Sequence, residues 1–443
     1  MGIIEIIQNC TSFKEYILNC YIYCLNNFST IQYDINNNFR FLKTESNKVL
    51  LNLSFYGKEK LLEYFLSLKC EENPKKFIIN LLAIDNLLIE FEQKIKYLHF
   101  KHSIKCNLDN NEYIIISKPV NIIYQSLKEK NIALREPKNV VIDFSSCFNN
   151  FMICQTSIDS YSCSIKELKE ISSHTDNLLL DFNSITMGLF SNFKKPDYIE
   201  NQLDNESSED TLIYFSGINN QSDIDNEIQR ILNISYQENI SIVLLPELFV
   251  YDSSRKIIKN WLKKMNEGQK IVMVVAGSCH KFNEDNNECI NESIIYDCYG
   301  NEIYSQNKFF QFFEPDDSKR EYLSYQNSKF ICIESAIGRF SISICLDFIS
   351  ESYLNFNKKF SVNINFVPAL SSSLFDFKRI AQEQGRYYSA STFCSNTIHP
   401  NFIKPENKGF MYVPMESKNS LKEISSLEQN SLYYLKIKLS DLQ

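Results

Sequence analysis

Three residues that could cooperate in catalysis each follow a strand-like segment of this 443-residue chain. Glu247 ends the apolar run Ser-Ile-Val-Leu-Leu-Pro-Glu, Lys308 ends Glu-Ile-Tyr-Ser-Gln-Asn-Lys, and Cys345 ends Arg-Phe-Ser-Ile-Ser-Ile-Cys. A glutamate can act as a general base, a lysine can stabilise an oxyanion, and a cysteine can act as a nucleophile. These three residue types at three strand ends therefore predict cysteine-based nucleophilic catalysis.

The segment before Cys345 alternates apolar and polar residues, which is the period of a strand. A thiol at the end of such a strand is held by a rigid element and meets backbone N–H groups at the turn. Cysteine is also among the most buried residue types, so a small core filler is the alternative interpretation of Cys345.

The three segments together resemble the signatures of a known family. Leu-Leu-Pro-Glu-Leu around Glu247, Gln-Asn-Lys-Phe-Phe around Lys308 and Gly-Arg-Phe-Ser-Ile-Ser-Ile-Cys-Leu-Asp around Cys345 resemble the Glu, Lys and Cys motifs of the nitrilase superfamily. They occur in the order of that family, whose members are also called carbon–nitrogen hydrolases. The resemblance covers residues 208–443, about half of the chain.

Other segments in this half also resemble family elements. They are the first strand (Thr211–Phe215), the helix before the Glu motif (Asp223–Glu238), the apolar strand Ile271–Ser278, the pair Asn291 and Ser293, and the closing strand Leu432–Asp441. The chain departs from the family pattern at several positions. Leu346 stands where members typically have Tyr, and Phe348 and Ile349 stand where many have Arg. Gln311 stands where Leu is usual, and Arg379–Arg386 only loosely matches a late family pattern. We expect these departures to affect the site and not the fold.

The resemblance implies an α/β (α+β) fold, a four-layer α-β-β-α sandwich. It also implies that Cys345 attacks a carbonyl or nitrile carbon to form a thioester. Glu247 would then be general base and acid, while Lys308 and the backbone N–H of Leu346 would stabilise the oxyanion.

Many relatives carry a second glutamate after the lysine. Glu321 and Glu314 are the candidates, and we prefer Glu321 because the stretch that it opens, Glu-Tyr-Leu-Ser-Tyr-Gln-Asn, resembles the family segment between the Lys and Cys strands. A solvated loop carboxylate is the alternative for either residue.

The function implied is that of a hydrolase acting on carbon–nitrogen bonds other than peptide bonds, with a small-molecule amide or nitrile as substrate and no cofactor. The alternative is a nitrilase-like interaction or assembly module within a multi-protein bacterial system such as phage defence. The long segment before the resemblance favours a specialised role, with residues 1–200 choosing a protein partner, a substrate or an assembly.

Composition excludes several other classes. The net charge of −8 argues against nucleic acid as a partner, and no apolar run reaches the roughly 18 residues of a membrane helix. The start of the chain lacks the basic residues of a secretory peptide, so we expect a cytoplasmic protein. The 14 cysteines are scattered and the histidines number only five, which favours free thiols without a metal site.

We divide the chain into a mainly helical region (1–105), a mixed α/β region of unknown family (106–200) and the nitrilase-like domain (208–443), with Asn201–Asp210 as the linker. Apolar periodicity predicts helices over Phe13–Asn26, Lys58–Leu68 and Lys75–Leu98, and buried strands over Tyr113–Ser117, Asn139–Phe144 and Asn177–Phe182. Asp143 and Asp181 follow apolar triplets, so a paired-carboxylate metal site is an alternative to their use as turn or helix caps.

We also expect a homo-oligomer. Nitrilase-like domains typically pair through a symmetric interface, and members commonly form it with the segment after the Cys turn, here Ser350–Lys359. The 33 Phe and 25 Tyr would supply apolar surface for such contacts. The alternative is that these aromatic residues fill two ordinary cores.

Overall fold

The structure is a computed structural model that describes residues 21, 41–42, 44–46, 48–49, 74–93, 104–108, 111–117, 151–158, 161–181, 184–190, 195–203, 210–314, 318–324, 329–388, 390–397, 409–414, 420–423 and 432–438. The described residues divide into two compact units, one before and one after the boundary between Ser157 and Ile158. Among the described helices, none is long and apolar enough to cross a membrane.

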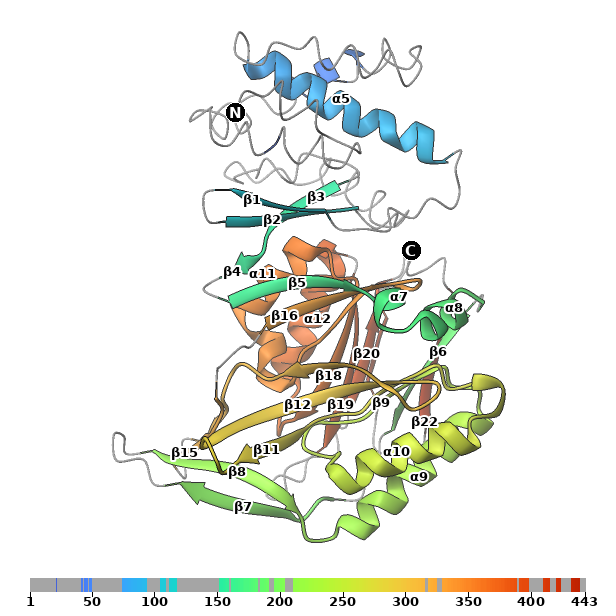
Figure 1. Ribbon diagram of the computed structural model, residues 1–443, viewed down its shortest axis with the longest axis vertical. Helices are drawn as coiled ribbons and strands as arrows, with labels where there is room; N and C mark the ends of the chain where they lie inside the picture. Colours follow the sequence, from blue (N-terminus) through green and yellow to red (C-terminus); the bar gives the residue numbers. More distant parts are fainter. Residues whose placement is uncertain are drawn as a thin grey trace. The chain divides into compact units, whose positions relative to one another are not determined.

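Among the described residues of the first unit there are one long helix and one small sheet (Figure 1). Helix α5 (Pro74–Gln93) confirms the helix predicted over Lys75–Leu98. Strands β1 (Ile104–Leu108), β2 (Asn111–Ser117) and β3 (Phe151–Gln155) pair in antiparallel order, and β2 confirms the strand predicted at Tyr113–Ser117. Apart from Tyr21, the other segments predicted before residue 150 lie outside the described residues.

The described strands of the second unit form two large sheets and one small one. The seven-stranded sheet has the order β11 (Cys279–Asn283), β12 (Glu288–Asp297), β10 (Met273–Val275), β9 (Ile242–Leu244), β6 (Ser184–Phe190), β22 (Leu432–Lys438), with β13 (Glu302–Asn307) paired to β12. The eight-stranded sheet has the order β21 (Ser420–Glu423), β20 (Gly409–Val413), β19 (Ser391–Thr397), β18 (Ile364–Leu370), β17 (Gly338–Ile342), β16 (Lys329–Ser335), β5 (Tyr161–Glu167), β4 (Ser157–Ile158). The four-stranded sheet has the order β14 (Phe313–Glu314), β15 (Lys319–Glu321), β8 (Thr211–Ile218), β7 (Tyr198–Leu203).

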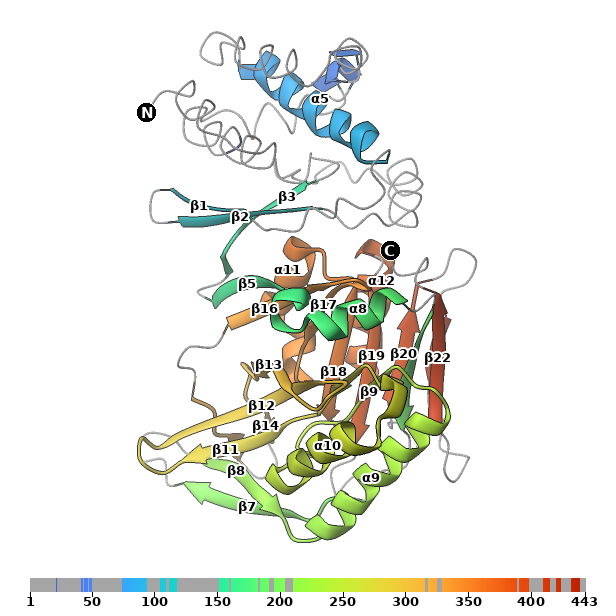
Figure 2. The ribbon, with the colours of Figure 1, turned by 45° about the vertical axis from the view of Figure 1, so that its right-hand side comes forward.

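The two large sheets face each other, since β19 of one contacts β6 and β9 of the other. Helices α9 (Gln221–Gln237) and α10 (Asp252–Met265) lie side by side outside the seven-stranded sheet, as Figures 1 and 2 both show. Their buried faces share one apolar core with β9, β10 and β12, to which Ile228, Ile258 and Val274 belong. Helices α11 (Glu351–Phe360) and α12 (Phe375–Tyr388) contact the eight-stranded sheet. The unit is therefore an α-β-β-α sandwich, which confirms the predicted fold class.

The strand predicted at Asn177–Phe182 is wrong, because this segment belongs to helix α8 (Ser173–Asp181), which follows the short helix α7 (Leu168–Ile171). Three consecutive leucines fit a buried strand or one turn of a helix equally well. Here only Leu179 of the three is buried, while Leu180 is 52% exposed. The Ser172 hydroxyl also accepts a hydrogen bond from the Thr175 N–H, which favours a helix start.

The predicted first strand of the sandwich also needs correction. Thr211–Phe215 does form a strand, β8, but β8 belongs to the four-stranded sheet. The place beside β9 is taken by β6, which runs parallel to β9 and antiparallel to the closing strand β22. Strands β5, β6 and β7 thus pair within the second unit, although they precede residue 208. The division into 1–105, 106–200 and 208–443 stays a prediction.

Candidate active site

Glu247 lies in a buried turn directly after β9 and is 1% exposed. The Ser278 hydroxyl accepts a hydrogen bond from the N–H of Leu248 at 3.2 Å and holds this turn against the end of β10. The close approach requires Gly277, which has a positive φ of 51° and where a Cβ would lie 2.0 Å from the carbonyl oxygen of Pro246. Glu247 is therefore fixed on a rigid support.

Lys308 follows β13, and its backbone N–H donates to the carbonyl oxygen of Asn291 at 2.8 Å. Its ammonium donates to Glu247 Oε1 at 2.8 Å and to Glu321 Oε2 at 2.7 Å, so Lys308 contacts both carboxylates directly. Burial opposes the charge on Lys308, but the two carboxylates outweigh it and hold the pKa of the ammonium well above its ordinary value. Lys308 is thus a buried cation between two acids.

Glu321 ends strand β15 and is completely buried. Besides Lys308, three groups contact its carboxylate: Asn291 Nδ2 at 3.1 Å, the Phe312 N–H at 3.1 Å and His280 Nε2 at 2.8 Å. Burial alone would raise the pKa of Glu321, but Lys308 and His280 outweigh it and lower the pKa to about 2. The preferred second acid therefore lies in the cluster.

The alternative second acid, Glu314, lies on β14 and is partly exposed.

Asn291 links the two acids. Its side-chain amide donates to Glu247 Oε1 at 3.0 Å as well as to Glu321 Oε1, and the residue is completely buried. The sequence motif pointed to Asn291, but its contacts with both carboxylates were not predicted. By holding one oxygen of each acid, Asn291 fixes their separation around Lys308.

Cys345 is the first residue of a short 3-10 helix, η4 (Cys345–Ile349), which follows β17. Its φ of 52° is uncommon for a residue other than glycine, and such backbone conformations cluster at functional sites. The sulfur lies 3.9 Å from the carbonyl oxygen of Leu370, and the residue is 4% exposed. Burial raises the pKa of the thiol well above its ordinary value, Glu247 adds to this effect, and Lys308 opposes it. The resting group is therefore a neutral thiol that must lose its proton when it reacts.

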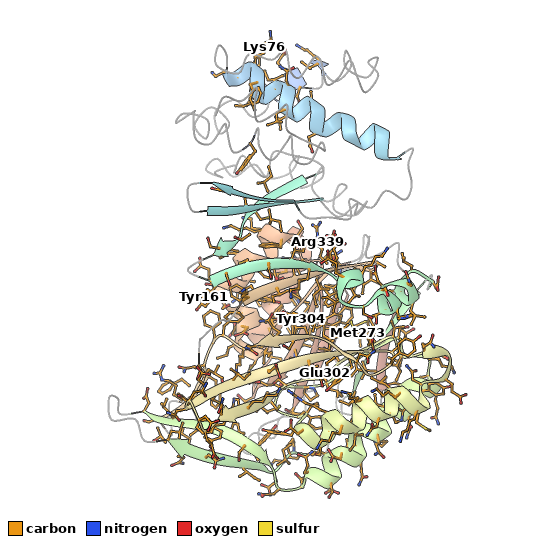
Figure 3. All side chains as sticks on the ribbon, in the orientation of Figure 1. Lys76, Tyr161, Met273, Glu302, Tyr304 and Arg339 are labelled. Carbon is orange, nitrogen blue, oxygen red and sulfur yellow. The ribbon has the colours of Figure 1, made fainter. Side chains whose placement is uncertain are left out.

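Asp347 joins the turn of the cysteine to the turn of the lysine. Its carboxyl group accepts hydrogen bonds from the backbone N–H groups of Phe309, at 3.1 Å, and Phe310, at 2.9 Å. Burial raises the pKa of Asp347 to about 8, although these two N–H groups act in the opposite direction. Tyr161 of β5, labelled in Figure 3, packs edge-on against Phe309, with the two ring centroids 5.4 Å apart. The position of Lys308 is therefore supported from two sides.

The sequence offered three further candidate residues, Leu346, Asp181 and Asp143. Leu346 lies in the first turn of η4, where backbone N–H groups lack intrahelical acceptors, and its oxyanion role stays a prediction. Asp181 is exposed at the end of α8, and Asp143 lies outside the described residues. Sequence reasoning missed His280, because a lone histidine after an apolar segment carries no motif signal. It noted Asp347 but assigned it no role.

Comparison with known proteins finds similarity only among solved structures: no protein-family model and no curated protein sequence matches the chain. A branch 10 nitrilase-superfamily protein from Saccharomyces cerevisiae is 14% identical and covers 58% of this chain and 92% of its own, with a TM-score of 0.41. An amidase from Nesterenkonia sp. is 13% identical over 59% of this chain and 93% of its own, with a TM-score of 0.40.

A carbon–nitrogen hydrolase from Helicobacter pylori is 11% identical over 58% of this chain and 90% of its own, with a TM-score of 0.40. The chain resembles nitrilase-superfamily structures over about 58% of its length. This is the family whose motifs the sequence resembles.

Proposed function

We propose that this chain is a carbon–nitrogen hydrolase of the amidase type that acts through a thioester on Cys345. The observation that carries the proposal is the buried cluster in which Lys308 bridges Glu247 and Glu321 beside a neutral thiol. A buried lysine held by two acids is a fixed positive charge, and such a charge stabilises an oxyanion most strongly where water is excluded.

In the first half of the reaction, the Cys345 sulfur attacks the carbonyl carbon of the amide, and the thiol proton moves to Glu247. The carbon–nitrogen bond then breaks, and Glu247 returns the proton to the departing amine or ammonia. Lys308 stabilises the negative oxygen together with the backbone N–H of Leu346. Because the pKa of the free thiol is raised, the proton transfer accompanies the attack and does not precede it.

In the second half, water attacks the thioester carbon while Glu247 accepts a proton from the water. The carbon–sulfur bond breaks, the carboxylic acid leaves, and the proton returns to the thiol. Glu247 suits both halves because Lys308 and Asn291 both donate to its Oε1, which holds the carboxylate in one orientation. If the substrate is a nitrile, the Cys345 sulfur would attack the nitrile carbon.

The test is release of ammonia from a panel of small amides and nitriles by the full chain. We expect turnover for at least one compound, and the Cys345→Ala variant should have none. Cys298→Ala is the matched control, because Cys298 is another buried free thiol, in the turn between β12 and β13. During turnover, mass spectrometry should find the acyl group on the peptide that contains Cys345. Equal ammonia release by the wild type and Cys345→Ala would refute the proposal.

The second candidate, an interaction or assembly module, is favoured by the burial of the reactive groups. Cys345 is 4% exposed and Lys308 is 3% exposed, so little of either side chain meets solvent. In this case Cys345 would resist iodoacetamide, and Cys345→Ala would leave assembly with a protein partner unchanged. Labelling of Cys345 by iodoacetamide together with ammonia release would exclude this candidate.

A further inference from the structure

His280 on β11 is a buried histidine, and both of its ring nitrogens have fixed neighbours. The backbone N–H of Phe215 on β8 donates to Nδ1 at 2.8 Å, and Nε2 lies 2.8 Å from Glu321 Oε1. The imidazole side chain is fully buried and stacks on the ring of Phe215, with centroids 5.8 Å apart and planes 5° from parallel. The ring therefore has little freedom to turn.

These contacts determine the tautomer. Nδ1 accepts a hydrogen bond from an amide that can only donate, so it carries no proton. The ring proton is therefore on Nε2, from which it is donated to Glu321. A second proton, on Nδ1, would place two donors against each other, since the Phe215 N–H already points at this nitrogen.

We propose that His280 is a positioning residue whose Nε2–H holds Glu321 as an anion and thereby keeps the Lys308 ammonium beside Cys345. Its catalytic meaning rests on the function proposed above, whereas its effect on Glu321 does not. The shortest chain of contacts runs from the Phe215 N–H through His280 and Glu321 to Lys308, with no polar step longer than 2.8 Å.

The four-stranded sheet helps to hold the Glu321 carboxylate in place. Glu321 lies on β15, which pairs in parallel with β8 so that Glu321 faces Ile213. Phe215, two residues further along β8, donates to His280. This sheet thus holds the carboxylate both through its own backbone and through the histidine of a neighbouring sheet. Strand β8, predicted as part of the sandwich, instead helps to build the site.

The titratable groups around Glu321 come from several elements. Lys308 and His280 contact it directly, Cys289 on β12 is close enough to be affected by its charge, and Glu247 shares Lys308 with it. Of these, Lys308 and His280 favour the anion. Loss of the histidine donor should therefore move the pKa of Glu321 from about 2 towards its ordinary value of 4.5.

Two variants separate hydrogen bonding from ring packing. His280→Phe keeps a ring but has neither donor nor acceptor. His280→Gln offers an amide oxygen for the Phe215 N–H and an NH₂ group for Glu321, at nearly the spacing of the two ring nitrogens. Neither variant carries a titratable group, so a comparison between them cancels the titration of histidine itself. His174→Phe on α8 is the control, because His174 is exposed.

The measurement is urea unfolding followed by fluorescence of Trp261, which needs no substrate. We expect His280→Phe to be the less stable variant, with an equilibrium constant of unfolding about thirtyfold larger than that of His280→Gln at pH 7. This factor corresponds to a rise of about 1.5 in the pKa of Glu321. At pH 3 the difference should fall below about tenfold, because Glu321 is then mostly protonated in the Phe variant.

A difference that is the same at both pH values would overturn the inference, because it would show a packing role alone. So would equal loss in both variants, or nitrogen-15 shifts that place the His280 proton on Nδ1. If an amide substrate is found, the acid limb of kcat/KM should move to higher pH in His280→Phe but not in His280→Gln. Absence of hydrolysis in the wild type would refute the proposed function and leave the unfolding result intact.

Discussion

Glu321→Gln should destabilise the sandwich at neutral pH, because it removes a buried anion that three elements hold in place. The glutamine oxygen could still accept from His280 and Asn291. Its NH₂ group, however, would face two donors, the Lys308 ammonium and the Phe312 N–H, which now bond to Glu321 Oε2. The variant therefore loses the charge and leaves two buried donors without their acceptor.

The magnitude follows from the pKa of Glu321. A fall from 4.5 in the ordinary state to about 2 in the folded chain corresponds to about 3 kcal/mol of stabilisation. Because the folded pKa lies below the ordinary value, this stabilisation is fully present above pH 4.5 and is lost as the pH falls through about 2. We therefore expect Glu321→Gln to lose about 3 kcal/mol at pH 7 and distinctly less at pH 3.

The assay is urea unfolding at the two pH values, followed by tryptophan fluorescence. Trp261 is the only tryptophan of the chain, it is 8% exposed in the core beside α9, and its Nε1 donates to Asn233 at 2.8 Å. Its emission therefore reports this unit. Glu314→Gln on the adjacent strand is the control and should change the stability by less than about 0.5 kcal/mol. A loss below about 1 kcal/mol at pH 7, or an equal loss at both pH values, would refute the reasoning.

Three further predictions concern the same unit. Cys345→Ala should abolish ammonia release while the free energy of unfolding stays within about 1 kcal/mol of the wild type, since one sulfur atom is removed; retained turnover would contradict the mechanism. Asp347→Ala should cost roughly 2 to 4 kcal/mol in urea unfolding, because two buried N–H groups, those of Phe309 and Phe310, lose their acceptor. Burial raises the pKa of Asp347 to about 8, so the neutral Asp347→Asn should cost less than half as much at pH 7, and an equal cost would be inconsistent with this account. Light scattering should find a species larger than the 51.9 kDa of one chain, whereas one-chain mass across micromolar concentrations would count against self-association.

Parts of the sandwich could be predicted because some of its central strands lie in segments with a clear strand pattern, followed by residues that end a strand. The run before Glu247 and the alternating segment before Cys345 are of this kind, and both became central strands. Asn177–Phe182 could not be assigned, since six residues do not separate the helical period from that of a buried strand. The place of β8 in the four-stranded sheet was not predicted either, since it concerns which strands pair, and a strand's own residues do not specify its neighbour.

The site shows the same division between local and long-range information. Glu247, Lys308 and Cys345 could be named because each carries a local signal, a reactive side chain at the end of a strand. His280 and Asp347 act through backbone N–H groups that lie 65 and 38 residues away in the chain. No spacing between residue types reveals such a pair, because the partner is an amide that nearly every residue possesses.

Glu321 changes the net charge of the cluster around Lys308. A buried ammonium is stable only when anions offset its loss of water, and Glu247 alone would be neutralised by Lys308. With Glu321 present, the two acids and one cation carry a net negative charge, which the amide donors and the His280 proton partly compensate. Burial raises the pKa of the Cys345 thiol, Glu247 adds to this effect and Lys308 opposes it. In the mechanism proposed above, the Cys345 thiolate would therefore form only as the bond to carbon is made.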